Sequence, residues 1–181
     1  MKQLLIVPAL PIAAIAASRG SGAANLDTRD PKEAWADSAV GSAVTFTVDL
    51  GAARAVDTIA LVAVRPPTAD ATWSIGGGAA DAGEAAILGP SPLRVPDVAG
   101  YFPETSLAVW HAVTPVTVRY LAITVSQPAG APLTIGRLLV GRAFVTARGK
   151  EWGSGRRPID TGAATALASG GFAAGEGVRK R

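Results

Sequence analysis

The chain has 181 residues and a mass of 18.2 kDa, a length typical of one domain with a tail. It contains no cysteine and a single histidine, His111, which excludes disulfide frameworks, thiol catalysis, cysteine-ligated zinc and any site that needs two histidines. Residues 1–141 carry a net charge of −2 and residues 142–181 carry +5, so the body lacks the basic surface typical of nucleic-acid binding.

The N-terminal segment allows two interpretations. An early positive charge, an apolar stretch over residues 4–17 and an Ala-x-Ala at 14–16 are typical of a secretory signal peptide. The stretch is too short, and too interrupted by Pro8 and Pro11, to form a membrane-spanning helix. The alternative is a buried strand over residues 12–18, which a Gly/Ser-rich loop follows.

The next segment is a polar loop with one short helical turn. Asp30 precedes Pro31, an N-cap followed by the first helical position, which predicts at most a turn or two. Trp35 comes directly after this turn and is expected to close one end of the core. Calcium bound by Asp27, Asp30 and Asp37 is an alternative, although their spacing matches no EF-hand loop and capping explains Asp30 better.

Short apolar segments with period-two alternation, bounded by Gly or Pro, follow along the chain. The predicted strands are 44–50, 56–64, 71–75, 107–113, 116–125 and 133–145. The side chains predicted to form the core are Phe46, Val48, Leu50, Ile59, Leu61, Trp73, Leu121, Ile123 and Val125. The alternation changes phase near Arg119 and Tyr120, which predicts a bulge or bend. Many short strands without a long helix predict an all-β antiparallel sandwich.

No catalytic set can be assembled from these residues, and we predict a protein that is not an enzyme and needs no cofactor. His111 lies beside Trp110 on a predicted strand and has no identifiable partner for general-base chemistry. Residues 76–78 (Gly-Gly-Gly) lack the Lys-Ser/Thr of a phosphate loop and predict a hairpin turn. Trp73 and Trp110 are candidate platforms for a sugar ring, but we expect both to be core residues.

Several short motifs occur in a defined order between residues 12 and 145. They are Ala-Ser at 17–18, Gly-Ala-Ala-Asn-Leu at 22–26, Asp-Pro at 30–31, Ala-Trp at 34–35, Val-Asp-Leu-Gly at 48–51, Val-Asp-Thr-Ile-Ala-Leu at 56–61, Trp-Ser-Ile at 73–75 and Arg-Tyr-Leu-Ala-Ile-Thr-Val at 119–125. This order resembles the discoidin, or coagulation-factor C-type, galactose-binding-like domain. The resemblance implies an antiparallel jelly-roll β-sandwich for residues 1–145. It also makes residues 12–18 the first strand, so signal cleavage after Ala16 or Ala17 would remove a core element.

The sequence after this domain carries a second resemblance. Arg-Pro-Ile-Asp at 157–160 and Gly-Gly-Phe-Ala-Ala-Gly-Glu-Gly at 170–177 stand in the order found in a group of tailed-bacteriophage and prophage virion proteins. The resemblance implies a non-enzymatic component of the tail or tail tip, in a virion assembled in the host cytoplasm. Its partners would be other virion proteins in a symmetric homo- or hetero-oligomer, together with a host-surface glycan. It implies neither nucleic-acid binding nor membrane insertion.

Residues 146–181 are basic, rich in Gly and Ala, and poor in large apolar side chains. So few large apolar groups cannot offset the entropy cost of ordering the backbone. We therefore expect an extended C-terminal arm, or the start of a second module, that becomes ordered only against neighbouring chains. The candidate contact residues are Trp152, Arg156, Arg157, Ile159 and Phe172. The alternative function is a secreted carbohydrate-binding module with a cleaved signal peptide.

Overall fold

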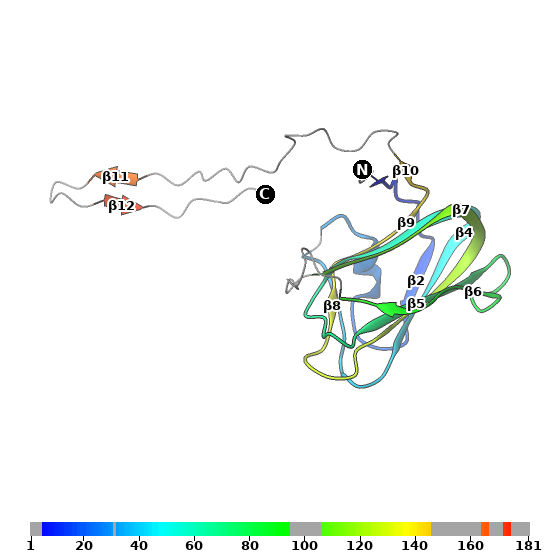
Figure 1. The fold of residues 1–181 in the computed structure, drawn as a ribbon, viewed down its shortest axis with the longest axis horizontal. Helices are drawn as coiled ribbons and strands as arrows, with labels where there is room; N and C mark the ends of the chain where they lie inside the picture. The colour runs from blue at the N-terminus through cyan, green and yellow to red at the C-terminus, as the bar shows by residue number, and fades with distance from the viewer. Residues whose placement is uncertain (1–4, 31, 95–105, 146–163, 167–171, 175–181) are drawn as a thin grey trace. The chain divides into compact units, whose positions relative to one another are not determined.

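The computed structural model describes residues 5–30, 32–94, 106–145, 164–166 and 172–174 (Figure 1). The chain divides into two units, residues 5–144 and residues 145–181 with 1–4. In the first unit the structure has β1 (Leu5–Ile6), β2 (Ala14–Ala17), the 3-10 helix η1 (Ala23–Asp27), β3 (Trp35–Ala36), β4 (Val44–Val64), β5 (Thr72–Gly78), β6 (Ala85–Pro92), β7 (Ser106–Ser126), β8 (Thr134–Ile135) and β9 (Arg137–Gly141), and β10 (Phe144–Val145) lies at the boundary. This unit is an antiparallel β-sandwich, as predicted.

The two layers of the sandwich share the long strands β4 and β7. Residues 44–49 of β4 pair with β2 and with residues 120–125 of β7, and β5 and β6 extend this layer beyond β7. Residues 58–62 of β4 pair instead with β9, and residues 58–61 also pair with residues 108–111 of β7. Buried side chains from both halves of β4 and β7 form one core. The two strands therefore bend from one layer into the other (Figure 1).

The bend in β4 corrects the prediction of two separate strands. The sequence predicted that Gly51 ends the strand that starts at Val44, but the strand continues through it to Val64. Gly51 has a φ of 74°, a conformation that glycine adopts without steric cost, and its N–H donates to the Asp49 carboxylate at 2.7 Å. The pairing with β7 shifts in register between Asp49 and Arg54. Glycine thus redirects the strand here and does not terminate it.

The predicted change of phase in β7 is confirmed. Val118 is buried and so is Leu121, three residues later, which places the switch at Arg119 and Tyr120. The residues that interrupt the pairing belong to β4, opposite this point. The Arg119 guanidinium donates to both oxygens of Asp49 at 2.9 and 3.1 Å. Hydrogen bonds from Arg119 and from the Gly51 N–H hold the pKa of Asp49 below its ordinary value.

The predicted hairpin turn at residues 76–78 is wrong. These glycines end β5, and the turn to β6 comes after them, at residues 79–84. A Cβ on Gly77 would lie 2.8 Å from the Ile87 side chain and 2.9 Å from the Leu121 side chain. A Cβ on Gly78 would collide with Glu84. Glycine is needed here because other chain segments approach closely, a use of glycine in strands that sequence patterns do not separate from turns.

The predicted core is confirmed in full. None of its nine side chains is more than 3% exposed: Phe46, Val48, Leu50, Ile59, Leu61, Trp73, Leu121, Ile123 and Val125. Trp35 is also fully buried, and its ring meets that of Phe46 edge-to-face, with centroids 4.8 Å apart. A strand within residues 12–18 is confirmed by β2, which pairs with residues 46–49, but the prediction that it is buried is wrong, because its residues are exposed or half-buried.

An ion pair fastens the loop between β2 and β4. Arg19 donates to both carboxylate oxygens of Asp37, at 2.7 and 2.8 Å. Burial by itself raises the pKa of Asp37, but hydrogen bonds from Arg19 and from the Ala39 and Ser38 backbone outweigh burial and hold it below its ordinary value. A lowered carboxyl pKa stabilises the fold above the unfolded-state pKa of about 3.9. This contribution is lost as the pH falls through the lowered value.

The second unit contains β11 (Ala164–Ala166) and β12 (Phe172–Ala174), which pair antiparallel in the register Ala164 to Ala174. Phe172, a predicted contact residue, starts β12. The other predicted contact residues, Trp152, Arg156, Arg157 and Ile159, lie outside the described residues. In the part of the chain that the structure describes, no helix is long and apolar enough to cross a membrane.

Candidate binding site

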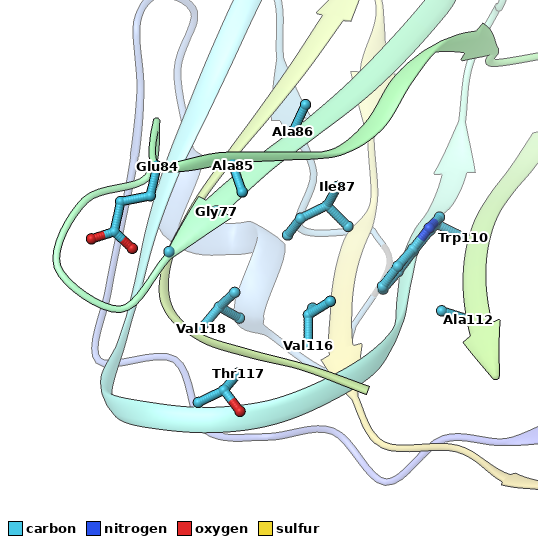
Figure 2. Close-up of a pocket in the computed structure, with 11 residues that line it drawn as sticks. Gly77, Glu84, Ala85, Ala86, Ile87, Trp110, Ala112, Val116, Thr117 and Val118 are labelled. Atoms are coloured by element: carbon cyan, nitrogen blue, oxygen red, sulfur yellow. The ribbon is translucent and has the colours of Figure 1, made fainter. Parts of the chain in front are cut away.

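A pocket of about 460 Å³ lies where β7 bends away from the β5–β6 hairpin (Figure 2). One wall comes from the end of β5, the turn and the start of β6, and the other from residues 110–118 of β7. The register between β4 and β7 shifts again here, because Val56 faces Val116 whereas Thr58 faces His111. The extra β7 residues at this shift, together with the small side chains of the hairpin, leave a space between the two walls.

Trp110 lines one end of this pocket (Figure 2). It is partly buried against the core, while Trp73 is only 3% exposed. The prediction of a core role is therefore confirmed for Trp73 but holds only in part for Trp110. A partly exposed indole offers a flat apolar surface against which a ligand can pack. Ile87 and Val116 lie between Trp110 and the opposite end of the pocket (Figure 2).

Glu84 supplies a carboxylate at the end of the pocket opposite Trp110 (Figure 2). Its oxygens accept the backbone N–H groups of Ala79 at 2.7 Å and Ala80 at 3.1 Å. These two hydrogen bonds close the β5–β6 turn and hold the carboxylate in place. Sequence reasoning missed Glu84, since a lone exposed glutamate in a loop carries no signal of its own. The only hint was the adjacent run of small residues.

His111 has the partners that the sequence did not reveal. Its Nδ1 lies 2.9 Å from Thr58 Oγ1 and 4.0 Å from Asp57 Oδ1. The Thr58 hydroxyl donates to Asp57 at 2.8 Å, so its oxygen is left to accept a hydrogen bond from the His111 Nδ1–H. Asp57 also accepts the Ala143 N–H at 2.6 Å. The hydrogen bond between Thr58 and His111 links β4 to β7. Thr58 does not present an activated nucleophile, because its hydroxyl proton points to the Asp57 carboxylate and the residue is 1% exposed.

The structure does not bring the three predicted calcium ligands together. Asp37 is engaged by Arg19, and Asp30 accepts the Lys32 N–H at 2.9 Å, which caps a turn. Asn25, at the same loop, uses its amide N–H to donate to the Ala34 carbonyl. Among the described residues, no group of three or more acidic, His or Cys side chains is close enough to hold a metal ion.

Comparisons with known proteins agree with the fold. The family 32 carbohydrate-binding module of NanJ from C. perfringens, solved with galactose, has a TM-score of 0.54 at 17% identity and covers 75% of this chain and 98% of its own. A structure of reduced XRCC1 bound to the DNA polymerase β catalytic domain has a TM-score of 0.56 at 16% identity, over 74% and 97%. The module CBM32-6 of a GH89 protein from Clostridium perfringens has a TM-score of 0.52 at 12% identity, over 70% and 90%.

These similarities define the class of fold, a galactose-binding-like antiparallel β-sandwich of the discoidin type. No protein-family model matches the chain, and no curated protein matches it in sequence. At such low identities a shared sandwich carries no information about the ligand.

Proposed function

We propose that this chain is a non-enzymatic binding module that acts through contacts with other macromolecules, as a structural component of a bacteriophage tail or tail tip. The observation that carries the binding role is the pocket between Trp110 and Glu84. The absence of enzymatic activity is supported by the network of Asp57, Thr58 and His111, the nearest approach to a catalytic set among the described residues. In that network the Thr58 hydroxyl is buried and donates its hydrogen bond to Asp57.

The virion role rests on the sequence. A discoidin-like sandwich followed by the Arg-Pro-Ile-Asp and Gly-Gly-Phe motifs resembles tailed-phage and prophage virion proteins. The partners would be other virion proteins in a symmetric assembly, and the location would be the virion. The basic segment 146–181 would act as the arm that contacts a neighbouring chain, because its charge is opposite to that of residues 1–141.

Purified particles from the host strain that carries this gene test the proposal. The chain should be present among the tail proteins by mass spectrometry. Trypsin should cut between Arg148 and Arg157 quickly in the free chain and slowly in the particle. A particle that lacks the chain would contradict the virion role, and equal cleavage rates in both samples would contradict the arm.

Carbohydrate binding is the second candidate function, and the partial exposure of Trp110 in a pocket favours it. Sugar-binding sites commonly stack an aromatic face against a pyranose ring. The solved module of NanJ, which has the same fold, was determined with galactose. In this case the chain would be a secreted module, and the mature protein would begin near Ala17.

A glycan screen with the full chain separates the two candidates. The virion proposal predicts weak sugar binding at most and no hydrolysis of the sugars tested. Micromolar affinity that is lost in Trp110→Ala, but kept in Leu107→Ala on the exposed face of the same strand, would favour the carbohydrate-binding module. An intact mass that starts near Met1 would support the virion proposal, and one that starts near Ala17 would support export.

A further inference from the structure

The geometry points to a specific occupant of the pocket. We infer that it receives Arg157 and Ile159 from the basic C-terminal segment of a second copy of this chain, with the arginine at Glu84 and the isoleucine near Trp110. The inference rests on the proposed function, because it names the partner that the pocket would contact in a symmetric assembly.

Glu84 presents a fixed carboxylate at one end of the pocket. Two backbone N–H groups hold its carboxylate at the pocket end, and the described residues place no Lys or Arg within ion-pair distance of it. A carboxylate has about four lone-pair sites, so two hydrogen bonds leave capacity for a guanidinium. The charge is therefore fixed in position and free to bind a cation. Arginine suits this arrangement because its planar guanidinium can donate to both oxygens of one carboxylate.

The rest of the pocket is mostly apolar. Trp110, Ile87, Val116 and small alanines make up most of the lining, and Thr117 is the other polar side chain beside Glu84. A sugar carries hydroxyl groups on nearly every carbon and needs several convergent polar partners. An arginine needs one carboxylate at its head, and its methylene stem packs on apolar walls. One cation next to one branched aliphatic group therefore fits this lining better than a sugar does.

The basic C-terminal segment contains an arginine and an isoleucine at a spacing that suits this pocket. Residues 142–181 carry +5 against −2 for the rest of the chain, so the two attract. Within the segment, Pro158 separates Arg157 from Ile159, and a residue before proline favours an extended backbone. In an extended strand, residues two apart lie on the same side, about 6.6 Å from each other. Arg157 and Ile159 can thus enter one pocket together.

A second copy of the chain can supply this segment. The contact is then heterologous, because the segment of one chain meets the pocket of the next. Repeated from copy to copy, such a contact generates a ring where the rotation closes and a helical filament where it does not. A ring of identical subunits is consistent with the symmetric assembly proposed above.

Peptide titration tests the inference. The receptor is the full chain carrying Arg157→Glu, so that its own segment cannot compete, and the ligand is a peptide of residues 153–162. Amide NMR shifts should change around Gly77, Ala86 and Ala112. The Arg157→Glu peptide should bind at least about tenfold more weakly, because it sets like charges together. Adding Glu84→Gln to the receptor should weaken the normal peptide about fivefold.

Two further receptor variants, Glu33→Gln and Thr117→Arg, complete the test. Glu84→Gln keeps an oxygen that can accept a turn N–H. Glu33→Gln is the matched control, because it removes an exposed carboxylate elsewhere and should leave affinity unchanged. Thr117→Arg adds a cation at an exposed lining position without disturbing the core, and it should block the peptide. Unchanged affinity in both Glu84→Gln and Thr117→Arg, or shifts that fall outside the pocket, would overturn the inference.

Self-association of the unmodified chain gives a second readout. Sedimentation equilibrium should show concentration-dependent association that Arg157→Glu weakens, and Glu84→Arg combined with Arg157→Glu should restore it. Galactose that fills the pocket while association persists would also overturn the inference. The outcomes of these experiments can be distinguished from those that test the proposed function. A chain found in particles but unable to bind the peptide defeats only this inference, and peptide binding by a chain absent from particles defeats only the virion role.

Discussion

Leu61→Ala and Ile123→Ala are each expected to lower the free energy of unfolding by about 2–5 kcal/mol. Both side chains are 0% exposed. Leu61 lies between Ala108 of β7 and Leu138 of β9 in the ladder. Truncation removes apolar atoms from the core and leaves a cavity that the two β-layers can close only in part, because their backbones are held by hydrogen bonds.

Urea unfolding of the full chain, followed by circular dichroism, measures this effect. Leu107→Ala is the matched control, because Leu107 is 53% exposed on β7 and its truncation should change the unfolding free energy by less than about 0.5 kcal/mol. If Leu61→Ala and Leu107→Ala lost the same stability, the core assignment would be wrong.

Trp35→Ala is expected to cost about 3–5 kcal/mol, among the largest effects in the chain. Trp35 is fully buried and packs edge-to-face on Phe46. Its Nε1 donates to the Arg19 carbonyl at 3.2 Å, so the indole also anchors the loop after β2. Gly20 permits this close approach, since a Cβ there would lie 2.7 Å from Nε1.

Trp35→Phe separates the two roles of this side chain. It keeps an aromatic ring against Phe46 but removes the N–H donor, so its stability should fall between those of the unmodified chain and Trp35→Ala. The same urea titration measures all three proteins. A Trp35→Phe protein as unstable as Trp35→Ala would show that the N–H donor, not the ring packing, dominates.

The fold was predictable because period-two alternation is a local property. The strand around Phe46 and its neighbour around Ile123 each place alternate apolar residues on one face, and this shared face of the layer is buried against the other layer. The phase change at Arg119 was readable for the same reason. In contrast, whether Gly51 ends or bends a strand depends on its partner in β7, which alternation does not reveal.

The candidate site escaped prediction because its parts are brought together by the tertiary structure. Glu84 comes from the β5–β6 turn and Trp110 from β7, and they line one pocket only where β7 bends away from the hairpin. Likewise, Thr58 lies 53 positions before His111, and only the β4–β7 register places them within a hydrogen bond. The sequence alone determined the nine predicted core residues, because their burial follows from local alternation. The tertiary structure decided which residues meet, because strand pairing, close approach at glycine and the gap at the β7 bend depend on distant segments.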